Sequence, residues 1–170
     1  SLATPPHPYF AIEESMHPNE ALIERLYSAF ARYNSDAMNA CYSPMATFED
    51  PAFGRLNYKE LTAMWRMLTS NAKDLLVTFG DITADDATGR CRWEARYTLS
   101  STGRPVHNVI DARFTFHDGL IVEHVDSFDF SRWMVQAMGF AGWLATWLPP
   151  LRAQVRQNVR ARLTSYMATH

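Results

Sequence analysis

The sequence has few cysteines, no long apolar run and no excess of charge of either sign. Two cysteines, Cys41 and Cys91, occur in 170 residues, and their spacing matches no zinc motif. We expect both to be buried free thiols, with a disulfide between them as the alternative. No apolar stretch reaches the roughly 18 residues that cross a bilayer. The formal net charge of −2 argues against a general attraction to nucleic acid or anionic lipid.

The residues that are present have the composition of a folded domain, with 47% hydrophobic, 13% aromatic and 20% charged residues. Three prolines among the first eight residues predict an N-terminal arm over residues 1–17. We expect one domain over residues 18–135 and a helical extension over 136–170 that packs on it. The N-terminal segment lacks the basic and apolar regions of a signal peptide, so we expect a cytoplasmic protein.

Helical periodicity is present in the first 70 residues. A helix is predicted from about residue 18 to residue 33, followed by a short helix that Asp36 caps and that carries Tyr42. Asn57 and Glu60 have the spacing of a capping box and predict the start of a third helix. Its apolar residues recur at i, i+3, i+4 and i+7: Leu61, Met64, Trp65 and Leu68.

Between residues 75 and 130 the pattern changes to strands. Apolar and polar residues alternate over 75–83, 90–100, 105–116 and 120–128, with turn residues between these runs. Asp118-Gly119 predicts a tight hairpin between the last two. Helices followed by antiparallel strands indicate an α+β domain in which helices cover one face of a curved sheet.

Two segments resemble a known superfamily. They are ATFEDP at residues 46–51 and TGRPVHNVIDARFTFHDGLIVEHVDSFD at residues 102–129. Both are similar to segments of the nuclear transport factor 2-like, or SnoaL-like, superfamily, which includes ketosteroid isomerase, polyketide cyclases and limonene epoxide hydrolase. The resemblance implies a cone-shaped half-barrel, whose curved antiparallel sheet wraps around the N-terminal helices and an apolar pocket. It leaves the function open, because this fold carries enzymes, binding proteins and structural partners.

Asp50 is the first candidate for catalysis. Strand alternation places it on one face with Ala46 and Phe48, and a cavity on that side would raise its pKa toward a value suited to proton abstraction. The resemblance to ketosteroid isomerase implies the same role, because Asp50 matches the aspartate that moves a proton between carbons. The alternative is a turn residue before Pro51 whose carboxylate accepts backbone N–H bonds.

The other two groups of the isomerase site match less directly. Ala112 falls at the place of its protonated aspartic acid, and alternation predicts that the adjacent Asp111 lies on the outer face. Leu26 falls at the place of its tyrosine, with Tyr27 one residue, or about 100° of helix, further on. Steroid isomerisation is therefore not specifically indicated.

The last strand supplies a second candidate. His124 and Asp126 are two residues apart, so alternation places both on one face. They share that face with three apolar residues: Leu120, Val122 and Phe128. The resemblance to epoxide hydrolase implies a water-orienting role for Asp126, while a core histidine bonded to a neighbour is the structural alternative for His124. Asn108 on the adjacent strand is expected to bind either a ligand or His124.

Other residues complete the predicted site. Arg92 and Glu94 resemble the Arg-x-Asp of the hydrolase, but alternation turns them away from the apolar face, so we do not expect its triad. No further ligands accompany His124 and Asp126 at a metal-binding spacing, and neither a metal nor another cofactor is expected. The candidates for substrate binding are mostly large inward-facing residues: Tyr27, Phe48, Trp65, Trp93, Asn108, Ile110, Phe114 and Trp133.

The C-terminal region contains an aromatic segment and an arginine repeat. Phe140, Trp143 and Trp147 lie in a segment too short to cross a bilayer. We expect this segment to cover the cavity mouth or to pack on a partner subunit, with a membrane-surface anchor as the alternative. Three arginines then recur every four residues, and we interpret them as a solvated helix face: Arg152, Arg156 and Arg160.

Together these features predict a small-molecule enzyme of the ketosteroid isomerase-like or polyketide cyclase-like type. Asp50 is expected to act as base, and the Asp126–His124 pair as acid or water-orienting group. The chemistry would be cofactor-independent isomerisation, cyclisation or dehydration of a hydrophobic substrate. The alternative is a non-catalytic ligand-binding or dimerisation module of the same fold. A homodimer formed through the sheet face is compatible with either, and nucleic-acid binding is not expected.

Overall fold

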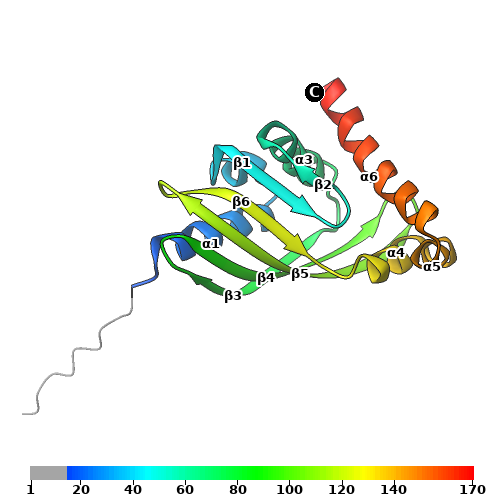
Figure 1. Ribbon diagram of the computed structural model, residues 1–170, viewed down its shortest axis with the longest axis horizontal. Helices are drawn as coiled ribbons and strands as arrows, with labels where there is room; N and C mark the ends of the chain where they lie inside the picture. The colour runs from blue at the N-terminus through cyan, green and yellow to red at the C-terminus, as the bar shows by residue number, and fades with distance from the viewer. Residues whose placement is uncertain (1–14) are drawn as a thin grey trace, which may run out of the picture.

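The computed structural model describes residues 15–170, so the predicted arm over residues 1–17 lies almost entirely outside the described residues. Helices precede and follow a run of strands, as expected of the α+β class (Figure 1). The elements in chain order are α1 (Pro18–Ala31), α2 (Ser35–Asn39), β1 (Tyr42–Asp50), β2 (Gly54–Leu56), α3 (Tyr58–Ser70), β3 (Leu76–Ala84), β4 (Thr88–Leu99), β5 (Arg104–His117), β6 (Leu120–Ser127), α4 (Phe130–Met138), α5 (Phe140–Trp147) and α6 (Pro149–Thr169).

A six-stranded sheet in the order β2-β1-β6-β5-β4-β3 forms the body of the molecule. Neighbouring strands are antiparallel except β1 and β6, which are parallel. The expectation of an antiparallel sheet is corrected at this pair, since the long connection through four strands and α3 lets β6 return beside β1 in the same direction. Figure 1 shows the sheet curving around α1, with α3 next to β1 and β2.

The inner face of the sheet is apolar and aromatic. Trp93 on β4 and Phe114 on β5 are buried there. From α1, the rings of Tyr27 and Phe30 both pack on Trp93 with centroid distances of 5.6 Å. Burying a large apolar side chain contributes about 1.5–3 kcal/mol, so this layer is a major source of stability. The predicted inward faces of β4 and β5 are confirmed by their buried residues: Cys91, Trp93, Ala95, Ile110, Ala112, Phe114 and Phe116.

A β-bulge changes the face that the start of β6 presents. The ladder between β5 and β6 slips between Thr115 and Phe116, and Val122 becomes an extra residue on β6. As a result Ile121 is fully buried, while Leu120 and Val122 are only half-buried. The predicted inward position is therefore wrong for Leu120 and Val122, because strict alternation does not continue through a bulge.

Side-chain caps fix the starts of several helices. Asn57 and Glu60 form the predicted capping box of α3, with N–H to oxygen distances of 2.9 and 3.1 Å. Helix α2 is capped by Asn34 instead of the predicted Asp36. Tyr42, which was expected on this second helix, is the first residue of β1.

The last three helices lie beyond the ends of β5 and β6 (Figure 1). Helix α5 packs directly on α4 at Gly142, where a Cβ atom would come within 1.9 Å of the carbonyl oxygen of Met134. Helix α6 then returns along α3, where Leu163 is buried and Arg160 forms an ion pair with Glu60 at 2.6 Å.

The arginine repeat of α6 bonds to the protein, but Arg156 is exposed and Arg160 partly exposed, so the prediction of a solvated face is only partly right. Arg156 donates to the carbonyl oxygen of Pro51 at 2.9 Å, and Arg160 donates to that of Phe53 at 2.9 Å. Arg152 bonds a side chain of α4. Two of the three arginines therefore hold the turn between β1 and β2. Their acceptors are backbone carbonyl oxygens, which any residue type carries, so the sequence does not indicate these bonds.

Two further expectations concern membranes and thiols. Within residues 15–170, no helix combines the length and apolarity needed to cross a membrane. Cys41 and Cys91 are buried free thiols, as expected. Burial raises the pKa of the Cys91 thiol to about 12, so it stays protonated.

Candidate functional site

Asp50 lies at the end of β1, and the turn that follows holds its carboxylate. Its Oδ1 accepts hydrogen bonds from the backbone N–H groups of Ala52 at 2.9 Å and Phe53 at 2.6 Å. Its Oδ2 makes no hydrogen bond within residues 15–170. The side chain is half-buried on the face that it shares with the buried Ala46 and Phe48. One oxygen thus serves the turn, as the structural alternative predicted, and the other remains unbonded.

His124 and Asp126 lie deeper on β6 and bond to each other. His124 Nε2 is 2.8 Å from Asp126 Oδ1, and His124 Nδ1 is 2.8 Å from the hydroxyl of Tyr42. Two indole N–H groups complete the network: that of Trp65 donates to the Tyr42 hydroxyl at 3.1 Å, and that of Trp93 donates to Asp126 Oδ1 at 3.4 Å. Both residues of the predicted pair are buried, at 0% exposed for His124 and 4% for Asp126.

One arrangement of protons gives every donor in this network an acceptor. An indole N–H can only donate, so the Tyr42 oxygen accepts from Trp65 and the Tyr42 proton points to His124 Nδ1. His124 then carries its own proton on Nε2 and donates it to Asp126. The imidazole is neutral in this arrangement, and the carboxylate accepts from two N–H groups. Because both ring nitrogens are bonded, His124 does not bond Asn108, which was one of its expected partners.

The two carboxylates, Asp50 and Asp126, lie on adjacent strands. Phe48 pairs with His124 in the parallel ladder of β1 and β6, and the register of that ladder extended by two residues places Asp50 beside Asp126 on the inner face. Burial raises the pKa of Asp50 to about 7, against the lowering effect of the N–H bonds from the turn, and the charge of Asp126 raises it further. At neutral pH Asp50 is therefore divided between its charged and neutral forms.

Tyr97 on β4 adds a hydroxyl to this region. The indole N–H of Trp133 on α4 donates to the Tyr97 hydroxyl at 2.8 Å. Burial raises the pKa of the Tyr97 phenol, the hydrogen bond from Trp133 lowers it, and the charge of Asp50 raises it. Tyr97 is absent from the site predicted from the sequence, although it shares the inward parity of Trp93 on the same strand.

The residues predicted to bind a substrate separate into two groups. Six of them pack on one another in the core and are at most 7% exposed: Tyr27, Phe48, Trp65, Trp93, Ile110 and Phe114. The other two, Asn108 and Trp133, are half-buried, as are Asp50 and Tyr97. The register of β4 and β5 places Asn108 diagonal to Tyr97 on the inner face. We refer to Asp50, Tyr97, Asn108 and Trp133 as the rim.

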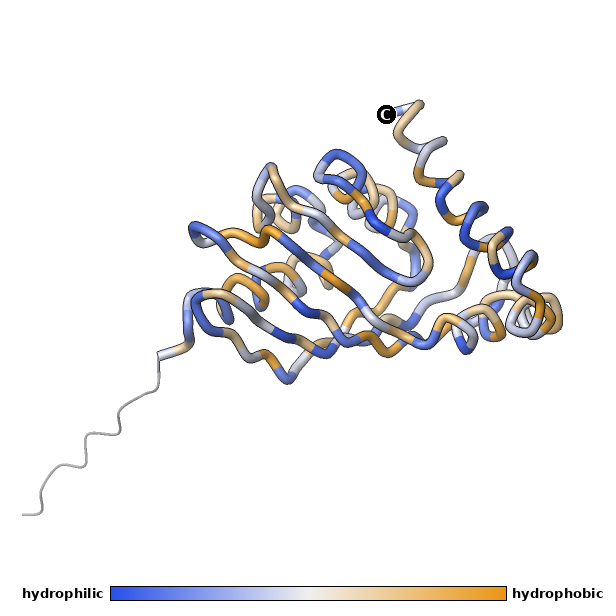
Figure 2. Tube along the Cα trace, viewed as in Figure 1, coloured by the Kyte–Doolittle hydropathy of each residue, from blue (hydrophilic) through white to orange (hydrophobic). Residues whose placement is uncertain are grey.

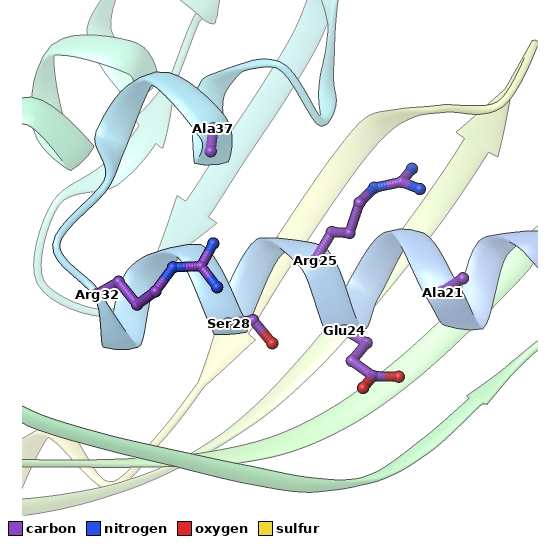
Figure 3. Close-up of a pocket in the computed structure, with 6 residues that line it drawn as sticks. All are labelled: Ala21, Glu24, Arg25, Ser28, Arg32 and Ala37. Carbon is purple, nitrogen blue, oxygen red and sulfur yellow. The ribbon is translucent and has the colours of Figure 1, made fainter.

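Two surface hollows of residues 15–170 lie apart from the buried His124–Asp126 pair. One follows α1, and its lining includes Arg25, Ser28 and Arg32 (Figure 3). Figure 3 shows these side chains along α1, with Ala37 on the neighbouring helix α2. The other lies where the start of β3, the end of β4 and the start of β5 meet α4, and Tyr97 and Gln136 contribute to its lining. The second hollow therefore meets the rim at Tyr97.

Tyr27 has a hydroxyl without a partner. Its oxygen is buried and makes no hydrogen bond within the described part of the chain. Burial raises the pKa of this phenol well above its ordinary value, and the charge of Asp126 raises it further. An unpaired buried hydroxyl costs about 1–3 kcal/mol, so Tyr27 is a local weakness in an otherwise apolar layer.

The outer face of the sheet carries the charged residues that alternation placed there. Asp111 is exposed and lies 3.8 Å from Arg92, and Glu94 lies 2.8 Å from His107. These positions agree with the prediction that Asp111, Arg92 and Glu94 point away from the interior. Among residues 15–170 no three His, Cys, Asp or Glu side chains are arranged to hold a metal ion.

The curved sheet and its helices also have counterparts among known proteins. A family model described as a SnoaL-like domain matches residues 23–124. The chain belongs to the SnoaL-like family. Among curated proteins, none matches this SnoaL-like chain significantly.

Solved structures show the same fold at low sequence identity. An NTF2-like protein of unknown function from Burkholderia pseudomallei is 17% identical, with a TM-score of 0.63 over 72% of this chain and 99% of that chain. A putative polyketide cyclase from Xanthomonas campestris pv. campestris is 19% identical, with a TM-score of 0.59 over 71% and 96%. An LEH-like epoxide hydrolase of M. tuberculosis is 18% identical, with a TM-score of 0.60 over 78% and 96%. At these identities the likeness establishes the NTF2-like cone fold of this SnoaL-like protein.

Proposed function

We propose that this SnoaL-like protein binds a small hydrophobic molecule at the rim and performs cofactor-independent acid–base chemistry on it, with Asp50 as the base. The observation that carries the proposal is the pair of inward carboxylates, Asp50 and Asp126, on adjacent strands. A base is most effective when its pKa lies near the working pH, and burial raises the pKa of Asp50 to about 7.

The proposed reaction begins with the abstraction of a proton from carbon. Oδ2 of Asp50 takes a proton from a carbon next to a carbonyl, and the electrons of that C–H bond form the C=C bond of an enolate. In an isomerisation, Asp50 returns the proton to a different carbon. In a cyclisation the enolate carbon attacks a second carbonyl, and the alkoxide formed there takes the proton from Asp50. In a dehydration a β-hydroxyl leaves with the proton from Asp50 as water. All three reactions share the first step.

The enolate oxygen needs a hydrogen-bond donor, and the rim contains two. The Tyr97 hydroxyl accepts from Trp133, so its own proton can be donated to a ligand. The amide of Asn108, diagonal to Tyr97, makes no hydrogen bond within residues 15–170 and offers two more N–H donors. Fixed donors in a partly buried site stabilise developing charge more than water does.

Asp126 and His124 lie behind Asp50 in this proposal. The Asp126 carboxylate has a fixed position, because His124 and Trp93 both donate to its Oδ1. The charge of Asp126 disfavours ionisation of Asp50 and so helps to keep the pKa of Asp50 close to neutral pH. Because both residues are buried, the Asp126–His124 pair acts through Asp50 in this proposal, and not as the acid or water-orienting group expected from the sequence.

Hydrogen exchange into enolisable ketones tests the base directly. A panel of cyclic ketones is incubated with the protein in D₂O, and loss of the α-proton signals is followed by ¹H NMR. We expect exchange with the wild type and a loss of at least about 100-fold with Asp50→Asn, the usual scale of general-base catalysis. Glu49→Gln is the matched control, because Glu49 is adjacent in sequence but exposed on the outer face. Equal exchange by Asp50→Asn and wild type would rule out Asp50 as the base.

A non-catalytic ligand-binding or dimerisation module is the second candidate function. The close packing of the six buried residues favours it, since a filled interior restricts a ligand to the rim. Ketones that raise the melting temperature without any exchange would support this module. A homodimer through the outer sheet face, where Arg92 and Asp111 pair, is part of the same alternative and is tested by sedimentation velocity of Asp111→Lys.

A further inference from the structure

Helix α5 exposes large apolar side chains at one end of the molecule. Phe140 is 73% exposed and Trp147 is 69% exposed. Four more exposed apolar residues lie on α4, α5 and α6 or between α5 and α6: Val135, Trp143, Leu148 and Leu151. We refer to these six residues as the aromatic corner. A group of large exposed apolar side chains marks a contact surface.

The aromatic corner faces away from the cone. Gly142 and Ala145 on the opposite side of α5 are buried against α4, so the geometry of α5 directs Phe140 and Trp143 outward. The rings of Phe140 and Trp143 stack with a centroid distance of 5.8 Å. Figures 1 and 2 show α4 and α5 at the outer end of the molecule, beyond the sheet, with much of both helices coloured as apolar. The expectation that this segment covers the cavity mouth is therefore wrong for the aromatic corner.

The chain segment that contains the aromatic corner carries charge of one sign. No charged residue lies between Arg132 and Arg152, and residues 130–170 contain five arginines and no acidic residue. Arg152 and Arg156 lie over the Phe130 ring at 5.1 and 5.0 Å. Arg104 lies close to Gly139, at the start of α5. Asp129, which caps α4, is the acidic residue nearest in sequence.

We propose that the aromatic corner docks on the surface of an anionic lipid bilayer. Tryptophan, phenylalanine and leucine on one side of a short helix insert at the level of lipid headgroups, and bordering arginines pair with anionic headgroups. A second copy of this chain fits less well, because a two-fold contact through the aromatic corner would bring the arginines of the two copies together. This surface does not depend on the proposed function, since the rim can be active or inactive while α5 binds lipid.

Vesicle binding by the full chain tests the proposal. Wild type is mixed with vesicles of phosphatidylcholine alone and of phosphatidylcholine with phosphatidylserine, and bound protein is separated by sedimentation. We expect stronger binding to the mixed vesicles, weaker binding at high salt, and quenching of tryptophan fluorescence by brominated lipid. The double substitution Phe140→Ser with Trp147→Ser should weaken binding by at least about tenfold.

A matched control uses another exposed apolar residue. Met45 on β1 is 83% exposed and lies outside the aromatic corner, so Met45→Ser should bind vesicles as wild type does. Circular dichroism checks that the double variant keeps its helices. The proposal is overturned if wild type ignores mixed vesicles, or if the double variant binds them equally well. It is also overturned if sedimentation velocity shows that the aromatic corner joins two copies and vesicles remain unbound.

Discussion

Asp50 and Asp126 project from neighbouring parallel strands onto the same inner face of the sheet. Their surroundings differ, since Asp50 is half-buried with one oxygen held by a turn, whereas Asp126 is buried with His124 and Trp93 as donors. Burial raises the pKa of Asp50 to about 7, and the nearby charge of Asp126 raises it further. Asp50 therefore titrates near neutral pH.

Asp50→Asn should change how stability depends on pH. The folded protein raises the pKa of Asp50 from 3.8 to about 7, so the folded state holds this proton more tightly than the unfolded chain does. The contribution of this group to the free energy of unfolding is therefore highest below about pH 4 and falls as pH rises toward 7, by up to about 4 kcal/mol. Asparagine does not titrate and keeps an oxygen for the turn, so the variant gains stability relative to wild type as pH rises.

Urea unfolding below pH 4 and above pH 7 measures this difference. Glu49→Gln, which removes the neighbouring exposed carboxylate, should leave the pH dependence of wild type in place. A constant stability difference between Asp50→Asn and wild type at both pH values would contradict the raised pKa.

Tyr42→Phe and Tyr27→Phe should have opposite effects on stability. Tyr42 bonds both Trp65 and His124, so loss of its hydroxyl leaves two buried groups unpaired and costs about 2–4 kcal/mol. Tyr27 is equally buried, but its hydroxyl has no partner in the described residues, so its removal is neutral or stabilising. Each variant is the control for the other in chemical denaturation, and equal losses would show that the hydrogen bonds of Tyr42 are not the cause.

Gly142→Ala should disturb the packing of α5 on α4. The new methyl group would meet the carbonyl oxygen of Met134 at 1.9 Å, and a backbone atom cannot rotate away. We expect a loss of about 3 kcal/mol, at the upper end for overpacked sites. Gly80→Ala on β3 is the control, because a Cβ there meets no atom within 4 Å. Thermal unfolding compares the two, and a Gly142→Ala protein as stable as Gly80→Ala would disprove this close approach.

Arg160→Gln should loosen the turn that follows Asp50. The Arg160 side chain donates to the carbonyl oxygens of Phe53 and Arg55 and pairs with Glu60, and it is partly exposed, so its loss costs about 1–2 kcal/mol. Arg162→Gln, two residues on and exposed, is the control. Hydrogen exchange at the amides of Ala52 and Phe53 is the sensitive measurement. Faster exchange in Arg160→Gln alone is expected, and unchanged exchange would show that α6 does not restrain the turn.

Much of the sheet could be predicted because alternation and burial agree on β4 and β5. The same rule placed His124 and Asp126 correctly, since both follow the bulge on β6. It failed at Leu120 and Val122, because a bulge depends on how two strands fit together and no single residue marks it. A local capping pattern predicted the start of α3, but Asn34 and Asp36 are both good caps, and only the packing of α2 chooses between them.

Only part of the site could be predicted, because the hydrogen-bond partners of His124 and Asp126 come from distant segments of the chain. Tyr42 reaches His124 across 82 residues, and Trp93 reaches Asp126 across 33. The neighbours of Tyr42 in the sequence predict a helix, so they do not indicate its inward position on β1. The donors and acceptors of a buried network are complementary only in three dimensions, and periodicity along the chain does not encode them.

The family match ends at residue 124. Arg160, which donates a hydrogen bond to the carbonyl oxygen of Phe53, lies well beyond that boundary, 107 residues after Phe53. A shortened protein cut to the family boundaries would retain Asp50 but lose the last three residues of the adjacent strand β6 and the helix that restrains the turn after Asp50. Such a fragment would not represent the whole chain in an activity assay, since the Asp50 carboxylate would lose its fixed orientation. Expression designs should therefore carry α6 intact.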